Sequence, residues 1–163
     1  MTAPLHDDPR ITAIGLLAEA HNGLMAKLAP QMAEHGLSEI EFEVLIRLAR
    51  SPQGRLRMTD VANQTSLTTS GITRVVDRLE RDGLVRRSAC PTDRRSSYAV
   101  LTGSGAERLT RVLPGHLELI ERWFTGLLIP GQLDALLDGV RAVRDAVRPG
   151  AEAGASTQPT AGR

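Results

Sequence analysis

Hydroxyl and guanidinium side chains are concentrated between residues 68 and 95, in a pattern that suits contact with DNA. Thr69, Ser70 and Thr73 are short hydrogen-bond donors and acceptors, the kind of side chain that reads base edges. Arg74 is long enough to reach a base or a phosphate. Thr68 stands before them where a helix N-cap belongs. The residues predicted to contact DNA are Thr68, Thr69, Ser70, Thr73, Arg74, Arg78, Arg86, Arg87, Asp93, Arg94 and Arg95.

The arginines of this segment are predicted to take two roles. Arg78, Arg86 and Arg87 are placed to follow the phosphate backbone, whereas Arg94 and Arg95 lie where a guanidinium can enter a minor groove. Residues 55–95 hold nine Arg and five Asp or Glu, a balance of +4 in a chain of net charge +1. Positive charge is therefore gathered on this segment. The alternative is that the hydroxyls are only caps and the arginines a solvated face.

Two short helices across a tight turn would position these side chains. They are predicted over 59–65 and 68–82, with a break at Ser66-Leu67 and a stop at Gly83. Extended runs at 84–88 and 97–101 flank a charged loop, which predicts a hairpin with a long tip, a wing over 88–97. The arrangement is a helix-turn-helix, whose second helix, over 68–82, can serve as a recognition helix in the major groove.

The remaining chain is predicted to be helical between two loose ends. Apolar residues at steps of three and four indicate helices over 11–29, 38–48, 106–127 and 132–147, and a short strand over 55–57. Pro30 should kink or end the first helix and Pro114 should bend the long one, while Gly103 to Gly105 marks a break. Residues 1–10 form a flexible lead-in and 149–163 a disordered tail.

The first and last helices are too apolar to stand alone at a surface, so their stripes must pack against each other or against a second chain. A purely intramolecular bundle is the alternative, but a twofold dimer better explains three helices outside the DNA-binding motif. The prediction is one domain over 11–148, with a winged helix-turn-helix lobe over about 38–102 and dimerisation helices over about 11–35 and 104–148.

Composition narrows the function class. With 163 residues, 41% hydrophobic and 24% charged, the chain suits a globular domain with a core. Residues 1–10 do not form a signal peptide and no apolar run predicts a membrane span. One Cys excludes an internal disulfide and suits the cytoplasm, where we expect the protein to be. Without metal-ligand spacing, a nucleophile elbow or a phosphate-cradling glycine loop, neither an enzyme nor a cofactor is predicted.

The chain resembles the MarR (multiple antibiotic resistance regulator) family. Three stretches carry the resemblance. Asp93-Arg94-Arg95 running into Leu101-Thr102 is similar to the family's wing, and Thr73 to Glu80 followed by Gly83-Leu84-Val85 is similar to its recognition helix. Leu37-Ser38 with the apolar positions up to Leu48 resembles its second helix. The likeness covers about residues 11–147. It implies a mainly α fold with a small β wing, in a homodimeric transcription regulator of double-stranded DNA, usually a repressor released by a small molecule or by oxidation. A winged-helix module that binds another protein and not DNA is the alternative.

Three further residues are candidates for sensing a signal. His21 interrupts the apolar stripe of the first helix and is the leading candidate for binding an anionic or phenolic effector, with a packed or interface histidine as the alternative. Trp123 lines a pocket or fills the core. Arginines near Cys90 would lower the pKa of its thiol, but oxidation sensors of the family typically carry their reactive Cys near the N-terminus, where this chain has none.

Overall fold

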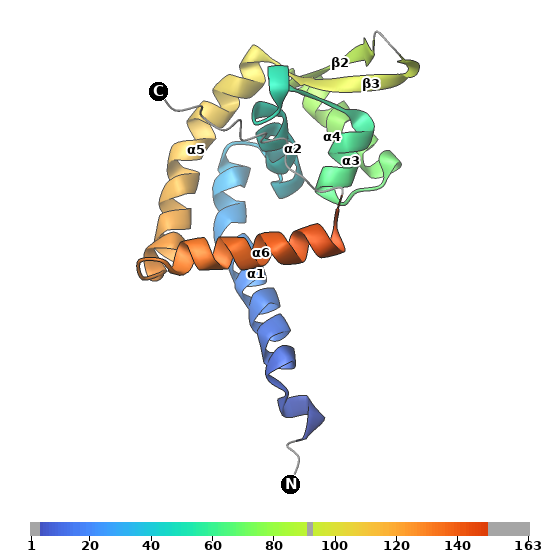
Figure 1. The fold of residues 1–163 in the computed structure, drawn as a ribbon. Coiled ribbons are helices and arrows are strands. Elements are labelled where there is room, and N and C mark those ends of the chain that lie inside the picture. The colour runs from blue at the N-terminus through green and yellow to red at the C-terminus, as the bar shows by residue number, and fades with distance from the viewer. Residues whose placement is uncertain (1–3, 91–92, 150–163) are drawn as a thin grey trace, which may run out of the picture.

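The computed structural model describes residues 4–90 and 93–149, without the side chains of 93–95. Helices and strands follow one another in the predicted order, and the fold is mainly α with a small β wing (Figure 1). The helices are α1 (Pro9–Glu34), α2 (Glu39–Ala49), α3 (Met58–Thr65), α4 (Thr69–Arg81), α5 (Gly103–Trp123) and α6 (Gln132–Val147), the strands are β1 (Arg55–Arg57), β2 (Val85–Cys90) and β3 (Asp93–Leu101), and the short 3-10 turns are η1 (Leu5–Asp7), η2 (Pro52–Gly54) and η3 (Thr125–Leu127).

The three strands form one antiparallel sheet in the order β1-β3-β2. Tyr98 in the central strand pairs with Arg57 of β1 on one side and with Ser88 of β2 on the other, so the predicted strand 55–57 lies beside the wing. Both wing strands run further toward the tip than predicted, so most of the loop predicted between residues 88 and 97 is strand. The polar sequence hid this, because the ladder is held by backbone hydrogen bonds and an exposed hairpin needs no apolar alternation.

The winged helix-turn-helix lobe is built around one apolar core. Helices α2, α3 and α4 bury their apolar faces against each other and against the sheet. Thr68 caps α4 by accepting a hydrogen bond from the Gly71 backbone N–H at 3.1 Å. Ser38 and Glu41, whose types and spacing predict a capping box, form one at the start of α2. The side chains that are fully buried in this core include Val44, Leu45, Leu48, Val61, Ile72, Val76 and Leu79.

Helix α1 is longer than predicted at both ends. Asp8 caps it by accepting from the Arg10 backbone N–H at 2.8 Å, and Pro9 suits the first turn, so the helix begins two residues before the predicted Ile11. The helix also continues through Pro30 to Glu34. Proline removes one backbone hydrogen bond, but the next residue is tied to α5, because Gln31 Nε2 donates to the Val112 carbonyl at 3.0 Å.

Helix α5 begins earlier and ends earlier than predicted. Thr102 caps it, accepting from the Gly105 backbone N–H at 3.0 Å, so the expected break at 103–105 is wrong. At the other end the backbone leaves the helix at Phe124 (φ −138°) and turns through η3. Gly126 permits this turn, since a Cβ there would lie 2.5 Å from the Glu121 carbonyl oxygen.

The long helices extend away from the lobe. Helix α1 packs against α5, and both run from the lobe toward α6, which lies across α1 in the view of Figure 1. Helix α6 matches the predicted range, and no described residue of it is buried. Among the described residues, no helix is both long and apolar enough to span a membrane.

Candidate nucleic-acid interface

Helix α4 separates an apolar side from a polar side. Ile72, Val75, Val76 and Leu79 are buried in the lobe core. The predicted base-reading residues Thr69, Ser70, Thr73 and Arg74 are all exposed on the N-terminal half of the helix, and so is the N-cap Thr68. A helix that presents short polar side chains and an arginine from its N-terminal turns has the surface that reads base edges in a major groove.

The hydroxyls of this surface are partly engaged within the helix. Thr68 Oγ1 accepts the cap hydrogen bond and lies 3.1 Å from Ser70 Oγ, and Thr73 Oγ1 donates to the Thr69 carbonyl at 2.8 Å. A hydroxyl that donates within the helix can still accept from a base. The side chains of Thr69 and Arg74 form no hydrogen bond or ion pair with any described residue, which leaves them available for DNA.

Arg78 links the recognition helix to α2. Its Nε lies 2.9 Å from Glu41 Oε1, and its side chain is about half exposed. The other oxygen of Glu41 accepts from the backbone N–H and the hydroxyl of Ser38 at 2.9 and 2.7 Å. Burial alone would raise the pKa of Glu41, but the Ser38 hydrogen bonds and the Arg78 charge outweigh it and hold the pKa below its ordinary value. The sequence predicted the capping box but not this ion pair.

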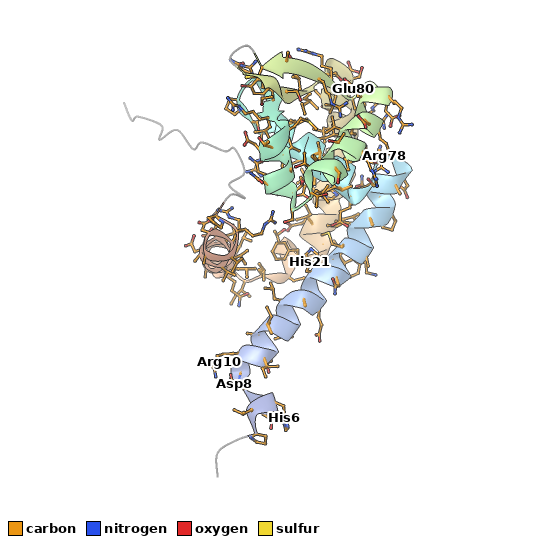
Figure 2. The ribbon with its side chains drawn as sticks, turned by 90° about the vertical axis from the view of Figure 1, so that its right-hand side faces the viewer. His6, Asp8, Arg10, His21, Arg78 and Glu80 are labelled. Carbon is orange, nitrogen blue, oxygen red and sulfur yellow. The ribbon has the colours of Figure 1, made fainter. Side chains whose placement is uncertain are left out.

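The two arginines of β2 have different surroundings. Arg86 is exposed and makes no ion pair with a described residue. Arg87 is 29% exposed, and its guanidinium lies 2.7 Å from Asp77 Oδ1 and 2.6 Å from Glu80 Oε2. Figure 2 places Glu80 and Arg78 at the end of the molecule opposite Asp8 and Arg10. Sequence reasoning did not select Asp77 or Glu80, although their spacing on α4 places both on one face.

The tip of the wing is described only in its backbone. Asp93, Arg94 and Arg95 begin β3, but their side chains lie outside the described residues, so a minor-groove contact stays a prediction. Cys90 at the end of β2 is 4% exposed, and its Sγ lies 3.8 Å from Tyr98 Oη. Reactive thiols are partly exposed, so this buried position does not support the redox role considered from the sequence.

Comparison with known proteins decides the family. The family model described as the MarR family matches residues 35–96. Sco3205, a MarR family transcriptional regulator from Streptomyces coelicolor crystallised in complex with DNA, is 33% identical with a TM-score of 0.80, over 91% of this chain and 93% of that one. The chain belongs to the MarR family. It is therefore a DNA-binding transcription regulator and not an enzyme, as the sequence predicted.

Two further relatives of this MarR-family chain bear on its function. The transcriptional repressor YetL of Bacillus subtilis is 39% identical over 88 residues, 54% of this chain and 53% of YetL. BpsR of Bordetella bronchiseptica, whose DNA binding is regulated by 6-hydroxynicotinic acid, is 25% identical with a TM-score of 0.71, over 82% of this chain and 99% of that one. The aligned segment thus spans about half the length of YetL. It spans 66% of a second relative from Bacillus subtilis, the transcriptional regulator YkoM, which is also 39% identical.

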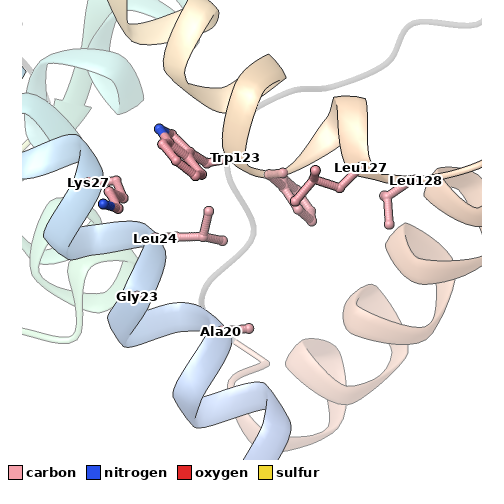
Figure 3. A pocket seen from close by; sticks show the side chains of 8 residues that line it. Ala20, Gly23, Leu24, Lys27, Trp123, Leu127 and Leu128 are labelled. Atoms are coloured by element: carbon pink, nitrogen blue, oxygen red, sulfur yellow. The ribbon is translucent and has the colours of Figure 1, made fainter.

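The two effector candidates of this MarR-family chain line different cavities. Trp123 lines an apolar cavity of about 490 Å³ between α1, the end of α5 and η3, where Lys27 Nζ lies 4.8 Å from the centre of its ring (Figure 3). His21 lines a cavity of about 330 Å³ between α1, α2 and α5, together with Met25, Leu28, Met32, Glu39, Phe42, Glu43, Ile46 and His116. In the described part of this single chain, the two side chains thus line separate cavities.

His116 is the residue of the second cavity that sequence reasoning missed. It is 7% exposed, its Nδ1 is buried without a hydrogen-bond partner in the described structure, and its ring centre lies 4.5 Å from that of Phe42. Burial lowers the pKa of His116, which favours a neutral imidazole. Its spacing from Leu109 and Val112 places it on the buried stripe of α5, and that spacing is the signal that was available.

Proposed function

We propose that the chain is a homodimeric repressor that binds a pseudo-palindromic operator. In this proposal each protomer places α4 in the major groove of one half-site and its wing in the adjacent minor groove. The observation that carries it is the exposed surface of Thr69 and Arg74 on α4 beside the arginine-bearing wing. The likeness to Sco3205, which was crystallised with DNA, supports this placement, and the likeness to YetL supports repression.

The dimer is proposed because the long helices leave apolar side chains exposed. Ile14 and Leu17 on α1 are 64% and 50% exposed, and Val143 and Val147 on α6 are 57% and 68% exposed. The apolar cavity lined by Trp123 lies between α1, the end of α5 and η3, and is a natural seat for a helix of a second copy. A monomeric protein rarely exposes large apolar patches, and a symmetric dimer would cover such side chains on both chains.

A DNA-binding assay tests the operator proposal. Fluorescence anisotropy with DNA from upstream of the chain's own coding region should give salt-dependent binding, and footprinting should find two half-sites about one helical turn apart. Arg74→Ala should lose about 1–3 kcal/mol of discrimination between operator and random DNA. The matched control is Arg122→Ala, which removes an arginine of α5 outside the proposed interface. A footprint over one asymmetric half-site would contradict the symmetric dimer.

The proposal includes release from DNA by a small aromatic effector in the His21–His116 cavity. This cavity has walls from α1, α2 and α5, and α2 also carries Glu41, which holds Arg78 of the recognition helix. A ligand that shifts α2 can therefore change the geometry of α4, provided that it binds the DNA-incompetent state more tightly. Because Glu39 and Glu43 also line the cavity, an uncharged phenol fits it better than the anionic ligand expected from His21 alone.

A matched pair of probes tests the effector proposal. 2-Naphthol should weaken operator binding in an anisotropy titration, and salicylate, an anion, should act less strongly. His21→Ala and His116→Leu should blunt the response to 2-naphthol, with the exposed His6→Ala as control. Equal responses of all the variants to 2-naphthol would exclude this cavity as the effector site. That result would leave the proposal of operator binding untouched.

A further inference from the structure

One arginine joins the recognition helix to the wing through four polar contacts. In addition to the two ion pairs, Arg87 Nη2 donates to the Thr73 carbonyl at 3.3 Å, and the Arg87 backbone N–H donates to Glu80 Oε1 at 2.9 Å. The contacts therefore span two turns of α4 and fix both the side chain and the backbone of β2. Burial lowers the pKa of Arg87, but its bonds to Asp77 and Glu80 outweigh burial and raise the pKa above its ordinary value.

The partners of Arg87 lie on the side of α4 that is proposed to meet DNA. Thr73, Asp77 and Glu80 follow one another at steps of four and three, so they form one stripe along the helix. Two carboxylates on such a stripe would repel phosphates if they were not neutralised. The guanidinium of Arg87 is placed between them, where it compensates much of their charge at the level of the wing.

We propose that Arg87 is a positioning residue, which clamps the wing against the recognition helix and shields Asp77 and Glu80, and is not a contact to phosphate. This inference rests on the proposed DNA binding through α4 and the wing. It replaces the sequence-based assignment of Arg87 to the phosphate backbone. Arg86, which is exposed on the same strand, keeps that assignment.

The geometry makes the clamp specific for arginine. A planar guanidinium can donate to two carboxylates and a carbonyl at once, whereas the ammonium of lysine is a compact charge that cannot span them. A phosphate contact tolerates lysine better, because a point charge satisfies it. Replacement by lysine therefore distinguishes the two roles, since it keeps the charge and removes the fork.

The experiment compares Arg87 with Arg86 by lysine and alanine substitutions. Operator affinity is measured over a range of salt concentrations. We expect R87K to lose affinity nearly as strongly as R87A, by about tenfold or more, the loss that 1.4 kcal/mol of weakened binding gives. The salt slope of both variants should stay close to that of the wild type. R86A should flatten the slope by about 0.9, the value of one phosphate contact, and R86K should recover most of the affinity that R86A loses.

A second variant keeps the test decisive if R87K folds poorly. In E80Q the clamp loses one carboxylate, so we expect weaker operator binding, although the helix becomes less negative. The control is D82N, which removes an exposed acid at the end of α4 that makes no contact with Arg87. If Arg87 bound phosphate, E80Q would release it and strengthen binding at least as much as D82N, and that result would overturn the proposal. So would R87K with wild-type affinity.

A measurement without DNA separates this inference from the proposed function. Hydrogen exchange of the β2 amides, above all the Arg87 amide bonded to Glu80, should quicken in R87K and remain close to the wild type in R86K. Faster exchange would support the clamp even if the wild-type protein bound no operator, a result that would refute only the proposed function. Equal exchange in the two variants would overturn the clamp.

Discussion

The lobe and the long helices differ in how far the chain itself buries their apolar side chains. Val44, Leu45, Val61 and Ile72 in the lobe are fully buried by their own chain, whereas α6 buries none of its described residues. Every large apolar side chain that is strongly exposed in the described part of the chain lies outside residues 38–102. The apolar side chains of the lobe are therefore covered within the chain, in part by Leu109 and Val112 of α5, but the long helices need a further surface to cover them.

This difference also divides what each region contributes to function. The lobe supplies a rigid surface for DNA, because its elements are tied by a common core and by Arg87 and Arg78. The long helices set where a second lobe would stand, so a change in their packing alters the spacing of two recognition helices. A regulator needs both properties, and four predictions test the division, from the largest expected effect to the smallest.

Replacing a valine by aspartate should have different consequences in the two regions. Val61→Asp places an unpaired charge in the lobe core, where Val61 is fully buried, and should cost about 3–5 kcal/mol or prevent folding. Val143→Asp, at a side chain that is 57% exposed, should leave the lobe folded but weaken the dimer strongly. Circular dichroism and sedimentation measure the two effects. A stable dimer of Val143→Asp would contradict the proposed use of the apolar face of α6.

Alanine at two helical glycines should sharpen the contrast. A Cβ at Gly105 of α5 would lie 2.2 Å from the Leu84 carbonyl oxygen, so Gly105→Ala must displace backbone of the lobe. We expect a loss of about 1–3 kcal/mol, which exceeds the gain of about 1 kcal/mol in helix propensity. Gly139 of α6 has no neighbour within 4 Å of such a Cβ, and Gly139→Ala should be neutral or stabilising. Urea denaturation measures the free energy of unfolding of both variants, and equal changes for Gly105→Ala and Gly139→Ala would contradict the contrast.

Local signals predicted the lobe well. The caps at Ser38 and Thr68 and the stop at Gly83 fixed the helix ends, since each acts within one turn of the chain. The predicted surface of α4 was also confirmed as exposed, because the apolar side chains at Ile72, Val76 and Leu79 determine which face is buried. The start of α1 at Pro9 follows the same rule, because Asp8 is a typical N-cap residue and Pro9 suits the first helical position.

Contacts between distant elements could not be predicted. Arg87 meets Asp77 and Glu80 only because the wing folds back along α4, and a sequence pattern does not specify the direction of an arginine side chain. Where α1 continues through Pro30, Gln31 donates to a carbonyl 81 positions away, a contact that no local pattern indicates. His21 and Trp123 were both effector candidates, and the sequence did not show that they line two different cavities.

The buried His116 should make stability depend on pH. Burial lowers the pKa of His116 below 6.5, so the unfolded chain binds a proton more readily than the folded one. The free energy of unfolding should therefore fall as the pH falls through about 6.5, and level off below the folded pKa. His116→Gln should remove this part of the pH dependence, with the exposed His6→Gln as control. Denaturation midpoints between about pH 8 and pH 5 measure it, and parallel curves for wild type and His116→Gln would contradict the prediction.

The smallest effect is expected where the two regions meet at the end of α6. Arg148 Nη2 donates to the Asn63 carbonyl at 2.9 Å and lies 3.4 Å from that of Gln64, at the C-terminal end of α3. A cation there satisfies late carbonyls of the helix and suits its dipole, so Arg148→Ala should cost about 1 kcal/mol. Arg144→Ala is the control, since Arg144 pairs with the adjacent Asp145 at 2.6 Å. Hydrogen exchange at the end of α3 should quicken only in Arg148→Ala. If both variants exchanged alike, α6 would not be fastened to the lobe through this contact, and the lobe would depend on α5 for its orientation.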